Sequence, residues 1–236
     1  MNLVIWIHGI EGENFTDLEI QACKDSVSKT IGDFSNWNHR LFNWNQEVHD
    51  REVQLWDRVQ NRGNFLTKQI RKGICFQGCD LWWTLQTLKD GQPGFINYDV
   101  QKNLDLIVKS NPFETLHFVC HSWGNWIGLR YIISHPEIKF NLISLGNPLF
   151  YGSGAFADWG DPGLLSNIKQ WVNVAIENDP IATLSSDNPN PKWKGFVKDH
   201  DLSFFNPLPI KSHCAYWSKD EVQKIITDGL KNFRVG

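Results

Sequence analysis

The sequence predicts an α/β fold in which a mostly parallel β-sheet is flanked by helices. Short apolar runs alternate along the chain with segments whose apolar residues recur at helical spacing. The run from Leu3 to His8 is continuously apolar, which is typical of a strand covered on both faces. A length of 236 residues suits one domain, residues 1–236, with right-handed crossovers between the strands.

The individual elements follow from apolar periodicity and from turn or capping residues. Strands are expected at Leu3–His8, Arg40–Trp44, Thr115–Cys120, Phe140–Leu145 and Ile168–Ile176, with a shorter one at Gly195–Val197. Helices are expected after Thr16, after Asn97, from the end of the Thr115–Cys120 strand to about Ser134, and after Ser218. Thr16-x-x-Glu19 and Ser218-x-x-Glu221 match the capping box, and Asn97 is an expected N-cap.

Residues 45–95 interrupt this alternation. Two helical stripes occur there without a convincing strand, and we therefore expect a helical insertion in the domain. Its indoles, among them Trp82 and Trp83, make it a candidate cap over a substrate pocket. The same pattern also fits an insertion that only packs on the sheet.

Composition excludes several classes of function. A net charge of −3, with no basic cluster, argues against a nucleic-acid partner. The apolar start is short and lacks a basic leader, and no segment approaches about eighteen uninterrupted apolar residues, so we expect neither a signal peptide nor a transmembrane segment. The odd set of cysteines favours a reducing, cytoplasmic location. Cys75 and Cys79 lack a second pair at zinc spacing, so we expect no metal site.

Tryptophan is unusually abundant, with twelve residues in the chain. Some indoles will fill the core. Exposed indoles offer flat apolar surface with one hydrogen-bond donor, which suits acyl chains or the faces of sugars. The composition is therefore compatible with an apolar substrate site, without requiring one.

The segment Cys120-His121-Ser122-Trp123-Gly124 lies at a predicted strand-to-helix junction. A sharp turn there holds a serine on strained backbone with its hydroxyl exposed, and small residues two positions away on either side prevent strand and helix from colliding. Gly124 is such a residue, whereas Cys120 is small but carries a Cβ atom. The pattern predicts a nucleophile elbow with Ser122 as nucleophile; an ordinary strand–helix turn is the alternative.

Residues with suitable chemistry follow other predicted strands, and the carboxyl ends of parallel strands meet at one edge of a sheet. Asp179 follows one such strand, and His213 directly precedes the last helix. A serine hydroxyl needs a base such as imidazole, and imidazole needs a carboxylate that fixes its tautomer. The backbone amides of Trp123 and of Ile10, which follows the first strand, would hold the oxyanion.

Two of these assignments have competitors. Asp158 and Asp161, on an earlier loop, are alternatives to Asp179 as the acid. His200 is an alternative base because it follows the short strand at 195–197; His213 is preferred because it directly precedes the terminal helix and follows a longer loop.

Two further histidines lie next to the candidate residues. His121 is expected to be a structural partner beneath the elbow rather than a second base. His8 either orients the oxyanion loop and borders the substrate pocket or only ends the first strand.

Taken in this order, the motifs resemble the α/β-hydrolase superfamily, in particular its lipase and esterase branch. His8-Gly9 is similar to the family's oxyanion loop, Cys120 to Gly124 to its elbow, Glu177-Asn178-Asp179-Pro180 to its acid loop, and Ser212-His213 to its catalytic histidine. The motifs span Ile7 to His213, although residues 45–95 match no part of the family that we can name.

The resemblance implies a serine hydrolase that cleaves a carboxylic ester through an acyl-enzyme, without a cofactor or metal. The substrate would be a small-molecule, lipid or acylated-sugar ester. A thioesterase or peptidase with the same triad, and a non-catalytic binding protein on the same fold, are the alternatives.

Overall fold

The computed structural model describes most of the α/β framework. The described residues are 1–9, 17–32, 36–42, 95–148, 162–187, 191–193, 195–203, 212–213 and 215–233. The expected insertion at 45–95, apart from Phe95, lies outside them together with its Trp82 and Trp83. Thr16, Ile10, Asp158 and Asp161 also lie outside the described residues.

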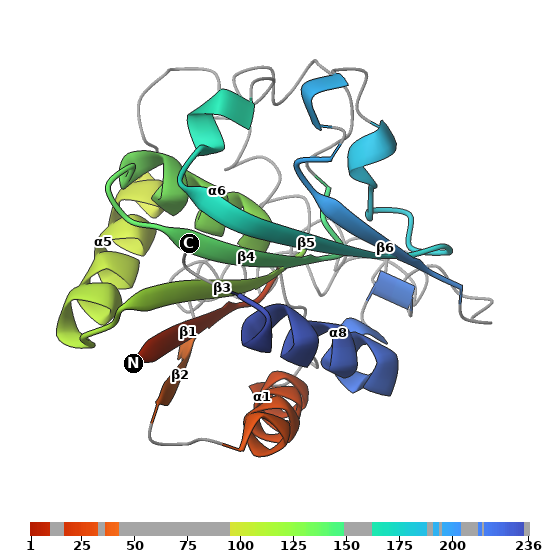
Figure 1. The fold of residues 1–236 in the computed structure, drawn as a ribbon, viewed down its shortest axis with the longest axis horizontal. Coiled ribbons are helices and arrows are strands. Elements are labelled where there is room, and N and C mark those ends of the chain that lie inside the picture. Colours follow the sequence, from red (N-terminus) through yellow and green to blue (C-terminus); the bar gives the residue numbers. More distant parts are fainter. Residues whose placement is uncertain are drawn as a thin grey trace, which may run out of the picture.

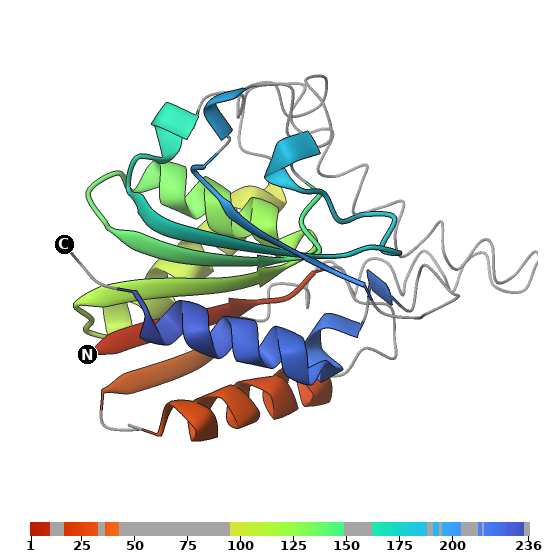
Figure 2. The same cartoon turned by 45° about the vertical axis from the view of Figure 1, so that its right-hand side comes forward.

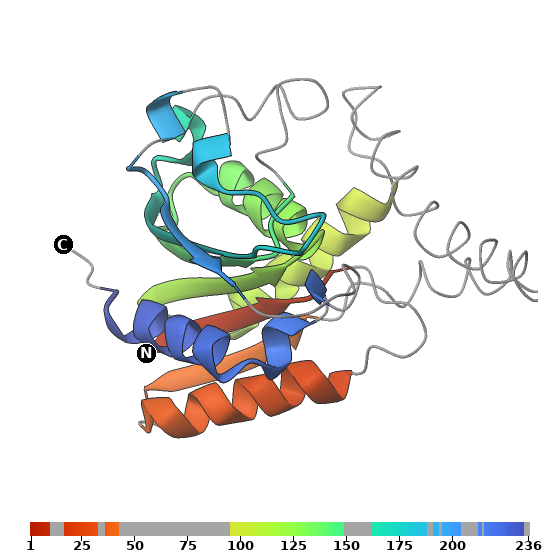
Figure 3. The same ribbon diagram turned by 90° about the vertical axis from the view of Figure 1, so that its right-hand side faces the viewer.

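A six-stranded parallel sheet forms the centre of the structure (Figure 1). Its strands are β1 (Asn2–Ile7), β2 (Trp37–Phe42), β3 (Thr115–His121), β4 (Phe140–Leu145), β5 (Ile168–Ile176) and β6 (Lys198–Leu202). They lie in the order β2-β1-β3-β4-β5-β6, and each neighbouring pair is parallel. All six strands therefore end at the same edge of the sheet, which faces the viewer in Figure 3.

Helices cover both faces of this sheet (Figure 2). One face carries α5 (Phe95–Ser110) and α6 (Gly124–Ser134), and the other carries α1 (Asp17–Ile31) and α8 (Asp220–Lys231). Short 3-10 helices follow the later strands at η3 (Pro162–Leu165), η4 (Ser185–Asp187), η5 (Pro191–Trp193) and η6 (Ala215–Ser218). The predicted fold class, a parallel α/β sheet flanked by helices, is confirmed.

Each central strand contributes to both cores. In β1, Leu3, Ile5 and Ile7 pack on the side of α5 and α6, whereas Val4 and Trp6 pack on the side of α1 and α8. Successive side chains of a strand point to opposite faces, so a strand covered on both sides needs apolar residues at every position. This is why the segment is a continuous apolar run in the sequence.

The two edge strands differ from the prediction. β2 begins at Trp37 instead of Arg40, because Trp37 to Phe42 pair in register with the whole of β1; the expected end at Trp44 lies outside the described residues. The strand expected at Gly195–Val197 is instead β6, Lys198–Leu202. Edge strands are partly exposed, and their polar residues, such as those of β6, hide the apolar pattern by which central strands are recognised.

Two predicted helix caps are also wrong. α5 begins at Phe95, so Asn97 lies inside its first turn. The N-cap of α8 is Lys219, which makes no side-chain capping bond. Ser218 belongs to η6, where its hydroxyl donates to the carbonyl of Ala215 at 3.1 Å. Asp220 and Glu221 lie in the first turn of α8 instead, where their negative charges interact favourably with the positive end of the helix dipole.

Candidate active site

Ser122 lies on the sharp turn between β3 and α6. Its φ angle is +53°, the one positive φ of a non-glycine residue in the described part of the chain. The Ser122 amide donates to the carbonyl of Leu145 at the end of β4, at 3.0 Å. A left-handed backbone at a non-glycine residue is strained and persists only where its surroundings hold it.

Two glycines allow the turn to pack closely against the end of β1. A Cβ atom on Gly124 would collide with the carbonyl oxygens of Ile7 and His8. A Cβ atom on Gly9 would lie 2.5 Å from the Cβ of Ser122. Both positions therefore require glycine for close approach of two backbones.

Cys120 stands where the first small residue of the elbow is expected, and α6 provides the room for it. Its side chain is completely buried. A Cβ atom on Gly128, one turn into α6, would lie 2.7 Å from the Cys120 sulfur. The absence of a side chain at Gly128 therefore accommodates the thiol. Burial raises the pKa of Cys120 well above its usual value, so the group stays a neutral thiol.

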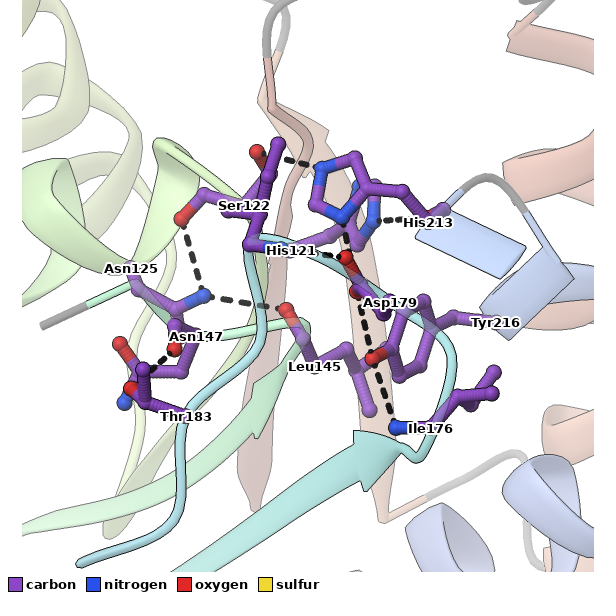
Figure 4. A network of polar contacts seen from close by, with 11 residues as sticks. His121, Ser122, Asn125, Leu145, Asn147, Ile176, Asp179, Thr183, His213 and Tyr216 are labelled. Atoms are coloured by element: carbon purple, nitrogen blue, oxygen red, sulfur yellow. Dashed lines mark hydrogen bonds and ion pairs between the residues drawn. The ribbon is translucent and has the colours of Figure 1, made fainter. Parts of the chain in front are cut away.

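Ser122, His213 and Asp179 form a continuous hydrogen-bonded line (Figure 4). The Ser122 hydroxyl oxygen lies 2.8 Å from Nε2 of His213, and Nδ1 of His213 lies 2.8 Å from Oδ2 of Asp179. The serine follows β3, the aspartate follows β5, and the histidine precedes η6. With Nδ1–H donated to the carboxylate, Nε2 is left to accept the serine proton.

The carboxylate of Asp179 is buried and saturated with donors. Its Oδ1 accepts the amide of Ile181 at 2.9 Å, and its Oδ2 accepts the hydroxyl of Tyr216 at 2.8 Å in addition to His213. Burial by itself raises the pKa of Asp179, but the hydrogen bond and charge of His213, with the other two donors, bring it below the usual value. The group is thus a carboxylate at neutral pH.

His121 packs against His213 and forms a hydrogen bond with its backbone. Its Nε2 lies 2.9 Å from the carbonyl oxygen of His213, and the two ring centroids are 4.8 Å apart. The pKa of His121 is lowered to about 3, mainly by burial and secondly by the charge of the neighbouring His213. The neutral ring donates Nε2–H to that carbonyl, so His121 holds the backbone of His213 and does not act as a base from this position.

Asn125 holds the elbow from inside α6. Its side-chain amide donates to the carbonyl of Ser122 at 3.0 Å and to that of Leu145 at 3.2 Å (Figure 4). The side chain is fully buried. Sequence reasoning missed this residue, although an asparagine in the first turn of an otherwise apolar helix was the available signal.

Gly146 and Tyr216 were also missed. Gly146 follows β4 with φ of +54°, and a Cβ atom there would lie 3.0 Å from the ring of Tyr216 and 3.1 Å from Oδ2 of Asp179. The position therefore provides both the turn and the space in which Tyr216, Asp179 and His213 pack together. A glycine directly after a predicted strand was a signal for a turn but not for this role.

The remaining predicted residues are placed as follows. Trp123 precedes α6 with helical φ and ψ of −61° and −23°, and its indole packs against the core on the α5 and α6 face. His8 is buried at the end of β1, with Nδ1 2.7 Å from the carbonyl oxygen of Gly9. His200 lies within β6, paired with Val174, and not in the Ser122–His213–Asp179 line.

Among the residues that the structure describes, no group of three or more His, Cys, Asp or Glu side chains is arranged to hold a metal ion. Cys75 and Cys79 lie outside these residues. Within the same part of the chain, every helix is too short or too polar to cross a bilayer.

Comparison with known proteins identifies the fold only. No family model and no curated protein matches the sequence. The structure resembles that of an uncharacterized protein from Bacillus cereus ATCC 10987, with a TM-score of 0.50 and 12% identity, over 98% of this chain and 58% of that one. This chain therefore spans somewhat more than half the length of that neighbour.

Two further neighbours have slightly lower TM-scores. A predicted CIB-like hydrolase from Thermoplasma acidophilum is 12% identical with a TM-score of 0.49, over 98% of this chain and 87% of that one. A lipase-esterase related protein from Clostridium acetobutylicum ATCC 824 is 12% identical with a TM-score of 0.46, over 99% of this chain and 94% of that one. At this identity the likeness concerns the fold alone, so the chemistry has to be argued from the site.

Proposed function

We propose that this protein is a serine hydrolase that cleaves a carboxylic ester through an acyl-enzyme. The observation that carries the proposal is the line from Ser122 through His213 to Asp179, with both contacts at 2.8 Å. The three residues come from three separate segments of the chain: Ser122 follows β3, Asp179 follows β5, and His213 precedes η6. This is the arrangement that converts a serine hydroxyl into a nucleophile.

In the first half of the reaction, Ser122 Oγ attacks the acyl carbonyl carbon while Nε2 of His213 takes the hydroxyl proton. The buried carboxylate of Asp179 stabilises the imidazolium that forms. The oxyanion is held by the Trp123 amide at the start of α6, where the helix dipole is positive, and by the Ile10 amide, a role assigned to Ile10 from the sequence. His213 then gives its proton to the leaving alcohol, and the acyl group stays on Ser122.

In the second half, His213 takes a proton from water, whose oxygen attacks the acyl-enzyme. Collapse of the second tetrahedral intermediate breaks the bond to Ser122 Oγ, which recovers the proton from His213. The acid is released and the residues return to their starting states. The cycle uses only side chains and amides of the chain and needs no cofactor.

An ester is favoured over a thioester or a peptide by the resemblance of the motifs to the lipase and esterase branch. The same triad also serves the other two leaving groups, so a thioesterase or peptidase remains the alternative within this mechanism. A lipid or acylated-sugar ester is favoured by the abundant tryptophan and by the indoles Trp82 and Trp83 in residues 45–95.

A purely ligand-binding role fits the elbow less well. The left-handed backbone of Ser122 costs about 1–3 kcal/mol, and the amide of Asn125 and two close-packed glycines hold the residue there. A binding site has no need for a serine held in this strained conformation with a base on its hydroxyl. The strain therefore favours catalysis.

The test is labelling with a fluorophosphonate probe, which reacts with an activated serine. The wild-type protein should be labelled at Ser122, and Ser122→Ala should lose the label while keeping its circular dichroism spectrum. Ser134→Ala, at an exposed serine that ends α6, is the matched control and should be labelled like the wild type. A folded wild-type protein that is not labelled would overturn the hydrolase proposal.

The leaving group is tested with esters, thioesters and amides of the same acyl chain. We expect the highest kcat/KM with the ester, and a higher value with the thioester or the amide would replace the esterase by the corresponding alternative.

A further inference from the structure

We propose that Tyr216 is a positioning residue of the catalytic machinery, which sets the charge that Asp179 presents to His213. The inference rests on the proposed function, since it concerns the base of the same reaction. It goes beyond the triad because the Tyr216 hydroxyl bonds Asp179 and acts on His213 through that carboxylate.

Tyr216 and His213 donate to the same oxygen atom. The Tyr216 hydroxyl lies 2.8 Å from Oδ2 of Asp179, and Nδ1 of His213 also lies 2.8 Å from Oδ2. The other oxygen, Oδ1, is taken by the amide of Ile181. The phenol therefore competes with the imidazole for one carboxylate oxygen (Figure 4).

The direction of the phenolic hydrogen bond is determined by its second partner. The amide of Ile176, at the end of β5, donates to the Tyr216 oxygen at 3.0 Å. With that oxygen accepting from an amide, its own hydrogen points to the carboxylate. The side chain is completely buried, and burial together with the charge of Asp179 raises the pKa of Tyr216 well above its usual value, so the phenol keeps its proton.

The fold places Tyr216 specifically for this contact. Tyr216 follows His213 by three residues and lies in η6, so donor and base come from one short segment. Gly146 leaves room for the packing, because a Cβ atom there would lie 3.0 Å from the Tyr216 ring and 3.2 Å from Cε1 of His213. Two further ionisable groups lie near this cluster: His121, whose ring centroid is 4.8 Å from that of His213, and Asp201, whose charge acts on Tyr216.

The consequence for the reaction has a definite sign. A phenol donating to Oδ2 offsets part of the carboxylate charge, so the imidazolium form of His213 is stabilised less than it would be by a bare carboxylate. Removing the phenolic hydroxyl should therefore extend the protonated form of His213 to higher pH.

The experiment compares Tyr216→Phe with Tyr131→Phe. Tyr131 is a matched control, because it is another fully buried tyrosine whose hydroxyl donates to a carboxylate, that of Asp105 at 3.2 Å, away from the triad. Both variants should lower the thermal midpoint. Only Tyr216→Phe should shift the acid limb of the kcat/KM profile to higher pH, by roughly half a unit to one unit.

A spectroscopic readout separates this inference from the proposed function. The low-field proton resonance of the His213 Nδ1–H, assigned by its loss in His213→Gln, should titrate at higher pH in Tyr216→Phe than in the wild type and Tyr131→Phe. That shift without any hydrolysis or probe labelling would support the role of Tyr216 while the hydrolase proposal fails. An unchanged titration and an unchanged acid limb would overturn the role of Tyr216.

Should Tyr216→Phe not fold, the donor can be strengthened instead of removed. Site-specific incorporation of 3-fluorotyrosine at position 216 makes the hydroxyl there a stronger donor while Tyr98, Tyr131 and Tyr151 stay unchanged. The acid limb and the His213 resonance should then shift to lower pH, opposite to the Phe variant. The absence of such a shift would contradict the proposal.

Discussion

Ser122 is held at three points, two of them by groups that are distant in the sequence and one by a residue of the following helix. Its amide is bonded to Leu145 and its carbonyl to Asn125, while its hydroxyl faces His213. The backbone contacts fix the strained φ angle, and the side-chain contact places the proposed base, His213, at the hydroxyl. A substitution at any of these partners should therefore affect the nucleophile without removing it.

The assignment of the base leads to a prediction at this scale. His213→Ala should lower kcat for a short p-nitrophenyl ester by a factor of about 10³ or more, because the hydroxyl proton has no acceptor. His200→Ala should keep most of the activity, since His200 lies within the edge strand β6. Steady-state kinetics on both variants decides between them, and the reverse result would transfer the role of base to His200.

The residues that surround the triad were harder to foresee than its members. Ser122, Asp179 and His213 follow recognisable turn motifs, and the structure brings them into contact. Tyr216 has no comparable local motif, because its role depends on meeting Asp179, which is 37 residues away in the chain. A buried tyrosine near a histidine is compatible with many structures, and only the contact distinguishes them.

The packing of α6 on β3 explains how the elbow tolerates Cys120. Strand and helix are in direct contact, and the volume of the cysteine side chain at position 120 is matched by its absence at position 128. The sequence showed the irregular Cys120 but not its complement, since nothing local relates a glycine inside a helix to a cysteine in the preceding strand.

This complementarity predicts the effect of Gly128→Ala. Alanine is the better helix former by up to about 1 kcal/mol, but its Cβ would lie 2.7 Å from the Cys120 sulfur. We expect a net destabilisation of about 1–2 kcal/mol, as is typical of overpacked cores. Urea unfolding measures it, and the double variant Cys120→Ala/Gly128→Ala should recover most of the loss. Equal destabilisation of the single and double variants would contradict the proposed fit.

For the whole molecule, buried histidines link stability to pH. His117 lies under α8 with Nδ1 accepting from Asn141 at 2.9 Å, and burial lowers its pKa to about 3. The pKa of His121 is likewise lowered to about 3, and that of His39 to about 4, in both cases first by burial. All three are neutral in the folded protein at neutral pH, whereas the unfolded chain binds protons below about pH 6.5.

Stability should therefore be complete above about pH 6.5 and decrease as the pH falls toward 4, by up to about 1.4 kcal/mol per pH unit for each histidine. Asp179, whose pKa is lowered, loses its contribution only at still lower pH. Urea unfolding across this range measures how the free energy of unfolding changes with pH. In His117→Gln this slope should correspond to the uptake of about one proton fewer on unfolding. A free energy of unfolding that stays constant between about pH 7 and about pH 5 would exclude the neutral buried state.

From the sequence alone we predicted the succession of the central strands and helices along the chain, and the candidates Ser122, Asp179 and His213. These features depend on apolar periodicity and turn chemistry, which act over a few residues. The three-dimensional structure was needed to show which of two histidines faces the serine, how Cys120 is accommodated, and that Tyr216 shares an oxygen of Asp179 with His213. Each of these depends on contacts between distant segments, such as the 91 residues that separate Ser122 from His213. Only the parallel sheet, which ends all its strands at one edge, brings such segments together.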